Sequence, residues 1–163
     1  MTSISELKNS LNTKTANLVL LQFATGGVFP IMWLYRHTKT VEHITGSKIA
    51  GDTFLIWMAV CSGLGLVLQA SGAGSDDLAF LAISGILLAF AVPVLQIIWA
   101  FRASKALQRY ALGKHRIDLR MNSFYTLVFN VFYVNYCINE LPELARSRDL
   151  LVGVSAQPDV QDR

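Results

Sequence analysis

Few side chains in this sequence are of kinds that do chemistry, and their spacing does not suit it. The two cysteines, Cys61 and Cys137, lie inside apolar stretches, where a thiol packs as a small apolar group. The three histidines, His37, His43 and His115, lie in polar stretches with no cysteine or carboxylate at metal-ligand spacing. No nucleophile has a neighbouring base, and no carboxylates are paired within an apolar segment. We therefore expect a non-catalytic protein that needs no metal and no cofactor.

Long uncharged segments separate the polar stretches that hold the histidines. Residues 53–70 and 78–101 contain no Asp, Glu, Lys, Arg or His. As helices they would reach roughly 27 and 36 Å, which is about the thickness of the hydrocarbon core of a bilayer. An apolar fraction of 53%, a charged fraction of 15% and a mean hydropathy of +0.42 agree with a membrane protein. We predict a transmembrane hairpin, and the alternative is a soluble helical protein in which both segments are buried core helices.

Two further apolar segments, 16–35 and 121–141, are interrupted. Glycine frees the backbone and proline lacks an amide hydrogen, so a straight helix is not expected in the first. Backbone freed in hydrocarbon must be satisfied by protein or trapped water, or the segment must dip in and return. The helix-break motif of this segment comprises Thr25, Gly26, Gly27, Pro30 and Trp33, of which Trp33 is interpreted as an anchor at the membrane interface. The polar stretch that follows, 36–52, is expected to be a loop.

The second interrupted segment, 121–141, is polar for a membrane span. Asn135 and Asn139 are two of its four asparagines, and only about fifteen residues are convincingly apolar, fewer than a full span needs. The segment either enters the bilayer part of the way or bonds its amides to other helices. Glu140 is expected in the headgroup region, and Pro142 is expected to end the helix or to start the next turn. The closing motif comprises Asn135, Asn139, Glu140 and Pro142.

The fold class predicted from these features is an all-α integral membrane protein. A central hairpin crosses the bilayer between two broken or partly inserted apolar helices, and four full transmembrane helices are the alternative. The parts are a surface amphipathic segment at 1–15, a helical membrane domain at 16–142, and a short amphipathic helix with a disordered tail at 143–163. The N-terminal stripe of Ile4, Leu7 and Leu11 suits a helix on the membrane surface or one packed on a partner.

Small residues four apart predict how the two arms of the hairpin pack. Such spacing lets helix backbones approach closely where lipid offers no hydrophobic drive to pack. The candidate packing residues are Ala59, Gly63 and Gly65 in the first arm and Gly85 and Ala89 in the second. Pro93 is expected to bend the second arm, and Gly113 is expected to end its continuation.

Six cations follow the hairpin. They are Arg102, Lys105, Arg109, Lys114, Arg116 and Arg120, of which the first three share one helical face. This density suits anionic lipid headgroups or a partner, and it also suits an ordinary determinant of topology. If the interrupted segments only dip in, all 14 Lys and Arg lie on one side, which puts both termini in the cytoplasm. The alternative with four crossings puts both termini outside. Nucleic acid is not an expected partner, because the cations flank apolar segments.

Two motifs carry a resemblance to a known family. Residues 25–36 read TGGVFPIMWLYR, and residues 136–142 read YCINELP. These resemble the opening and closing signatures of a bacterial membrane family catalogued as domain of unknown function 4234. The resemblance spans residues 16–142 and implies a bacterial inner-membrane location, without an activity, substrate or cofactor.

The function expected from the sequence is that of an accessory or assembly component of a membrane complex. Such a protein would act through helix packing and a basic cytoplasmic face, and would associate with itself or with a larger complex. The alternative is a small transporter or channel built around the broken helices. Against that alternative stands the lack of ionisable residues within the spans, since ion coupling normally needs one.

Overall fold

The structure is a computed structural model that describes residues 2–72 and 79–155, and all regular structure within these ranges is helical. The elements are α1 (Thr2–Leu11), α2 (Thr15–Ala24), α3 (Val28–Thr45), α4 (Asp52–Gly72), α5 (Ala79–His115) and α6 (Ser123–Ser155). The described residues contain no strand, so the predicted all-α class is confirmed. The tail from Gly153 is expected to be disordered, but residues 153–155 belong to α6, and the rest of the tail lies outside the described residues.

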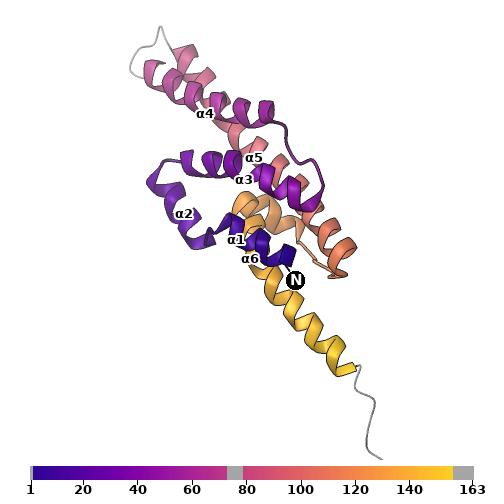
Figure 1. Ribbon diagram of the computed structural model, residues 1–163. Helices are drawn as coiled ribbons and strands as arrows, with labels where there is room; N and C mark the ends of the chain where they lie inside the picture. Colours follow the sequence, from indigo (N-terminus) through magenta and orange to yellow (C-terminus); the bar gives the residue numbers. More distant parts are fainter. Residues whose placement is uncertain (1, 73–78, 156–163) are drawn as a thin grey trace, which may run out of the picture.

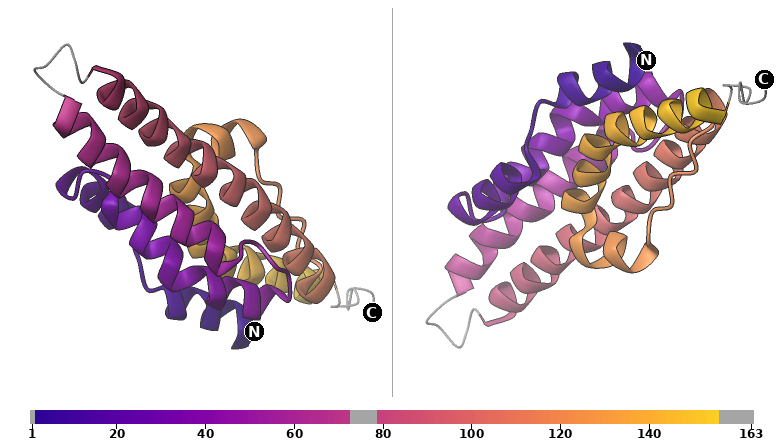
Figure 2. Two further views of the ribbon diagram at one scale, coloured as in Figure 1. Left: turned by 90° about the horizontal axis from the view of Figure 1, so that it is seen from above. Right: turned by 90° about the horizontal axis from the view of Figure 1, so that it is seen from below.

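Helices α4 and α5 form an antiparallel pair that lies side by side in every view (Figures 1 and 2). Both are long and apolar enough to cross a membrane, and they are the two such helices among the described residues. Only 6% of the most apolar stretch of α5 is buried within the molecule, and 22% of the most apolar stretch of α4 is buried. Buried helices of a soluble core would show the opposite, since a core helix hides its apolar residues from solvent.

The second half of α5 belongs to the packed core. Trp99, Ala103, Leu107 and Ala111 recur every four residues and are fully buried, which makes one face of the helix a core stripe. The helix has 37 residues and a length of about 55 Å, longer than a bilayer core requires. It runs two residues past Gly113 and ends at His115.

The first interrupted segment is broken where the sequence predicts it. Helix α2 ends at Ala24, Gly26 and Gly27 adopt φ of +56° and +93°, and α3 starts at Val28 with Pro30 in its first turn. Proline is tolerated there because the first amide groups of a helix have no intrahelical acceptor. The expectation of a loop over 36–52 was wrong, since α3 continues to Thr45 and residues 46–51 alone connect it to α4.

The last segment is interrupted at one of its four asparagines. Helix α6 changes direction at Asn130, whose φ of 32° and ψ of −105° are not helical. It then runs through Pro142 to Ser155, so of the two alternatives predicted for Pro142, the one in which it ends the helix was wrong. An interior proline costs a helix one backbone hydrogen bond but does not stop it where the neighbouring turns stay packed. The short helix expected after residue 143 is the continuation of α6.

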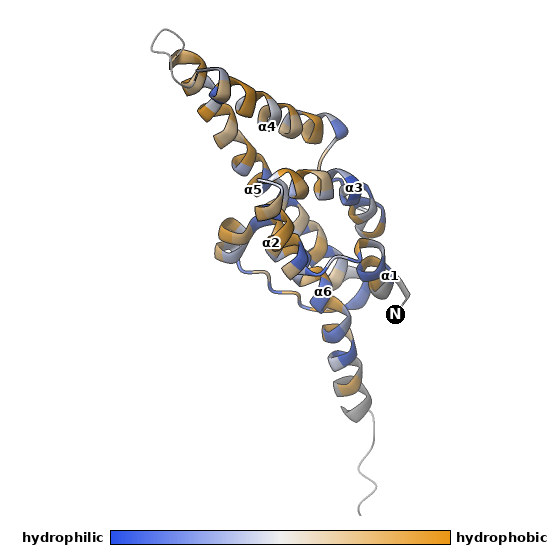
Figure 3. Cartoon of the chain, turned by 90° about the vertical axis from the view of Figure 1, so that its left-hand side faces the viewer, coloured by the Kyte–Doolittle hydropathy of each residue, from blue (hydrophilic) through white to orange (hydrophobic). Residues whose placement is uncertain are grey.

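The core lies at the near end of the hairpin, which is the end where α4 begins, and α3 and α6 contact α5 there (Figures 1 and 2). The stripe of Ile4, Leu7 and Leu11 is buried there, on a helix that contacts α3 and α6. The far end of the hairpin projects beyond the other helices (Figure 1). Figure 3 shows apolar residues along α2, α4 and α5, and polar ones in α1 and in the last part of α3.

Candidate functional site

The helix-break motif forms a turn that satisfies its own backbone. The N–H groups of Thr25, Gly26 and Gly27 donate to the carbonyl oxygens of Leu21, Phe23 and Gln22 at the end of α2. The side-chain oxygen of Thr25 accepts from the N–H of Phe29 at 3.0 Å and so caps the start of α3. Glycine is favoured at two successive positions, because a side chain there would strain the positive φ.

A single residue, Thr13, joins the opening motif to the closing motif. Trp33 donates from its indole nitrogen to the Thr13 hydroxyl at 3.2 Å. Asn135 and Asn139 donate from their amide nitrogens to the Thr13 carbonyl oxygen at 3.0 and 3.1 Å. Asn135 is fully buried and also donates to the Thr15 hydroxyl at 3.1 Å. The two motifs, more than 100 residues apart in the sequence, therefore meet at the link between α1 and α2.

Next to this junction lies a buried aromatic cluster. Trp33 meets Trp99 edge to face at 6.3 Å between ring centroids, and it lies 5.0 Å from the His37 ring. Trp99 donates to the Thr38 hydroxyl at 3.0 Å. Burial, with the neighbouring Arg36 cation adding to it, lowers the pKa of His37 below its ordinary value. The interpretation of Trp33 as an interfacial anchor was wrong, because its ring is 2% exposed and packs in the core.

The hairpin arms cross at two of the predicted glycines. A Cβ atom on Gly85 would lie 2.7 Å from the carbonyl oxygen of Gly65, and one on Gly65 would lie 3.2 Å from the backbone nitrogen of Ala89. Gln69 donates to the carbonyl oxygen of Gly85 at 3.3 Å across the same crossing. Gly65, Gly85 and Ala89 thus pack as predicted.

The other two predicted packing residues lie elsewhere. Ala59 and Gly63 are exposed on the outer side of α4, and nothing lies within 4 Å of a Cβ atom placed on Gly63. The prediction that they pack against the second arm was wrong. The spacing of four residues defines a face, but the rotation of each helix decides which of two small-residue faces meets the neighbour.

The connection between α3 and α4 is held from two sides. The carboxylate of Glu42 accepts from the N–H groups of Ile49 and Ala50 at 2.6 and 2.9 Å. Arg102 of α5 donates to the carbonyl oxygen of Ile49 at 3.3 Å and lies 5.9 Å above the Phe54 ring. Arg102, predicted to face lipid or a partner, therefore also holds this connection.

The remaining predicted cations lie on or near the end of α5. Lys105, Arg109 and Arg116 are exposed, Lys114 lies 5.7 Å above the Tyr110 ring, and Arg120 is paired with Asp118 at 3.0 Å. A second ion pair joins Lys39 and Asp52 at 3.0 Å, and its hydrogen bond raises the pKa of Lys39.

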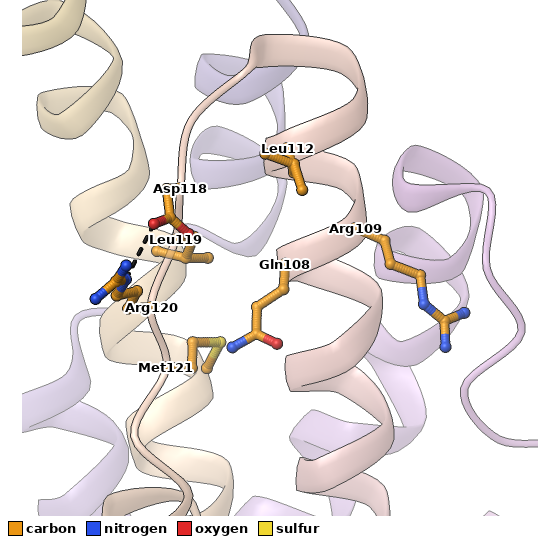
Figure 4. A pocket seen from close by; sticks show the side chains of 7 residues that line it. All are labelled: Gln108, Arg109, Leu112, Asp118, Leu119, Arg120 and Met121. Atoms are coloured by element: carbon orange, nitrogen blue, oxygen red, sulfur yellow. Dashed lines mark hydrogen bonds and ion pairs between the residues drawn. The ribbon is translucent and has the colours of Figure 1, made fainter.

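A shallow groove of about 490 Å³ runs between α5 and residues 118–121 (Figure 4). Leu112, Leu119 and Met121 contribute apolar side chains to it, and Gln108 is close to Met121. Arg109 points away from the groove, and Arg120 turns toward Asp118 (Figure 4). The groove is therefore not a clamp for a phosphate group.

The closing motif divides into buried and exposed parts. Asn135 and Asn139 take part in the Thr13 junction, whereas Glu140 is exposed and Pro142 is half-buried within α6. Within the described residues, Asn135 Oδ1 and Ser104 Oγ are the buried side-chain atoms that lack a hydrogen-bond partner. The described residues hold no group of three or more His, Cys, Asp or Glu side chains that could bind a metal ion.

Sequence reasoning missed the residues at the centre of these contacts. Thr13 and Thr38 each accept an indole hydrogen bond, and Glu42 caps the connection to α4. A threonine or a glutamate in a polar stretch carries no signal of a long-range partner. Only the pairing of tryptophans with nearby hydroxyls could have pointed to them, because a buried indole N–H needs an acceptor.

The fold assigns the chain to a broad class, that of helical proteins with two candidate membrane-spanning helices. The described chain is all-helical, with two helices long and apolar enough to cross a membrane. No protein-family model, curated protein or solved structure matches the chain. The resemblance to domain of unknown function 4234 stays a prediction based on two short motifs.

Proposed function

We propose that the chain is a non-catalytic integral membrane protein that serves as an accessory or assembly component of a bacterial inner-membrane complex. Helices α4 and α5 cross the bilayer, and the α2–α3 turn and the start of α6 enter it from the cytoplasmic side. The exposed apolar surface of α5 carries this proposal, since only 6% of the most apolar stretch of this helix is buried within the molecule. Such a surface is stable in contact with lipid tails or a partner and costly in water.

The length of α2 supports a hairpin with partial insertions over four full crossings. Its 10 residues span about 15 Å, half of what a crossing requires. The turn after it satisfies its own amide groups, which is the condition for irregular backbone at membrane depth. That self-sufficiency also favours a structural turn over the ion site that a transporter or channel would need there.

The packed core at the near end of the hairpin, here called the base, supports a role in assembly. Helices α1, α3 and α6 and the end of α5 form a core at the near end of the hairpin, with exposed cations on α5. A folded base with basic side chains offers a rigid surface to anionic lipids or to a partner at the membrane surface.

Two experiments test the topology. Extraction of membranes with sodium carbonate at high pH should leave the chain in the pellet, and release into the supernatant would refute integral insertion. Single cysteines at Asn9, Lys48 and Ser75, in a C61A/C137A background, are then labelled in intact spheroplasts with a membrane-impermeant maleimide. We expect labelling of the cysteine at position 75 alone. Four crossings with both termini outside would also expose the cysteine at position 9.

A third experiment tests assembly. The full chain with an affinity tag is purified in mild detergent, and its mass is measured by light scattering. We expect a defined homo-oligomer or a stoichiometric second component. A lone monomer that retains its helicity would refute the assembly role and leave the topology intact.

A further inference from the structure

The width of the molecule differs along the hairpin. Helices α3 and α6 contact the pair formed by α4 and α5, and α2 contacts α3 and α6. The far end of the pair projects beyond all of these helices (Figure 1). We propose that the chain is a wedge in the bilayer, and that it concentrates where the leaflet holding the α2–α3 turn is convex. This inference rests on the proposed crossing of α4 and α5.

The first part of the wedge is the α2–α3 turn. Leu20 and Phe23 of α2 are 67% and 80% exposed, and Met32 of α3 is 56% exposed. Exposed cations stand at both ends of this apolar segment, Lys14 before α2 and Arg36 within α3. A segment that starts and ends at a cation and reaches about 15 Å enters one leaflet and returns to the same headgroups.

The second part of the wedge is the start of α6. Phe124 and Leu127 are 64% and 49% exposed, and the helix turns back into the core after Asn130. Helix α6 contacts α5, whose exposed apolar surface is assigned to lipid, and lipid tails are therefore also the fitting occupant at the start of α6.

The far half of the hairpin is narrow because its helices touch at the backbone. A Cβ atom on Gly85 would lie 2.6 Å from the backbone nitrogen of Gln69, closer than real Cβ atoms approach. Glycine at this crossing allows the helix axes to approach more closely than larger side chains would permit. The far leaflet thus accommodates two closely packed helices, and the near leaflet accommodates these plus two inserted segments. Insertion of helical surface into one leaflet makes membrane binding sensitive to curvature.

The test uses the full chain, labelled with a fluorophore at its N-terminus and reconstituted into giant vesicles of phosphatidylcholine and phosphatidylglycerol. A narrow tube is pulled outward from each vesicle, and the protein density on the tube is compared with that on the flat membrane. An impermeant quencher added outside separates molecules with an outward N-terminus from those with an inward one. We expect outward molecules to be enriched on the tube by about threefold and inward molecules to be depleted.

Two variants with matched losses of side-chain volume sharpen the test. L20A/F23A/L127A trims the near leaflet, and L66A/F80A/L87A trims the far leaflet by the same two leucines and one phenylalanine. All six side chains are about half exposed or more. The first variant should move the enrichment toward one, and the second should keep or increase it.

The outcomes separate the two proposals. Equal tube enrichment of outward and inward molecules, in a chain that resists carbonate extraction, would overturn the wedge and leave the crossing of α4 and α5 standing. Reversal of the sign, with inward molecules enriched, would also overturn it. Release of the chain by carbonate would instead refute the proposed function.

Discussion

Gly65 and Gly85 meet at the crossing of α4 and α5, where a Cβ atom on Gly85 would lie 2.7 Å from the Gly65 carbonyl oxygen. Backbone at this distance cannot move aside as a flexible side chain can. G85A should therefore push the two helices apart and lower the free energy of unfolding by about 1–3 kcal/mol. The measurement is the far-ultraviolet circular dichroism of the chain during a titration with sodium dodecyl sulfate in mixed micelles.

Gly63 provides the matched control for Gly85, because a Cβ atom placed on it meets nothing within 4 Å. G63A should leave stability unchanged or raise it by up to about 1 kcal/mol through helix propensity. Equal effects of the two substitutions would contradict the described crossing.

The Thr13 junction predicts a stability loss at Asn135. N135A removes hydrogen bonds to the Thr13 carbonyl oxygen and the Thr15 hydroxyl, at a buried site where new partners are scarce. We expect a loss of about 1–2 kcal/mol in the same detergent titration. N17A, at an exposed asparagine of α2, should change stability by less than about 0.5 kcal/mol. Wild-type stability of N135A would show that the junction does not form.

Glu42 should protect the connection between α3 and α4. E42A leaves the N–H groups of Ile49 and Ala50 without their carboxylate acceptor, at a cost of about 1.5–3 kcal/mol. Hydrogen exchange at these two amides should accelerate, and E42Q should restore part of the protection because an amide oxygen still accepts. E140A, at an exposed glutamate of α6, is the control and should leave both amides unchanged.

The environment of His37 predicts a dependence of stability on pH. Its pKa is lowered in the folded chain from an ordinary value of 6.5, so below pH 6.5 the unfolded chain binds more protons than the folded one. Stability should therefore be full above pH 6.5 and fall as the pH drops from there toward the lowered pKa. The measurement is tryptophan fluorescence during detergent unfolding between pH 8 and pH 5.

H37Q should remove most of this decrease, because it deletes the titrating group. H43Q serves as the control, since His43 is exposed at the end of α3, and should keep the decrease. A stability that rises on acidification of the wild type would contradict the burial of a neutral His37.

The cations of α5 should have two different roles, one in lipid binding and one in holding the connection between α3 and α4. Lys105 and Arg109 are exposed, and their replacement in K105Q/R109Q should weaken the preference for phosphatidylglycerol over phosphatidylcholine by about 2 kcal/mol at low salt. Quenching by brominated lipids of the fluorescence of Trp57, which is 60% exposed, measures this preference. R102Q should instead accelerate hydrogen exchange at residues 46–51. An unchanged lipid preference in K105Q/R109Q would refute a lipid-facing role.

The sequence by itself determined the helical class, the two long apolar helices and the position of the first break. These features follow from local causes: runs without charge, the backbone freedom of Gly26 and Gly27, and the length that a helix gains per residue. It also identified Gly65 and Gly85, since small residues four apart mark a packing face.

Only the tertiary structure decided which of these residues meet. The indole of Trp33 is buried because Thr13 offers an acceptor from the link between α1 and α2. Gly63 is exposed because α4 turns its other small-residue face toward α5. Likewise α6 passes through Pro142, against local preference, because Leu141 before it and Ala145 after it pack on the core. Local propensity is worth up to about 0.7 kcal/mol per residue for most residues and about 3 kcal/mol for proline, and the burial of several large apolar side chains is worth more. Helix starts and spans are therefore visible in the sequence, whereas the orientation of each face and the partners of buried polar groups depend on contacts between distant segments.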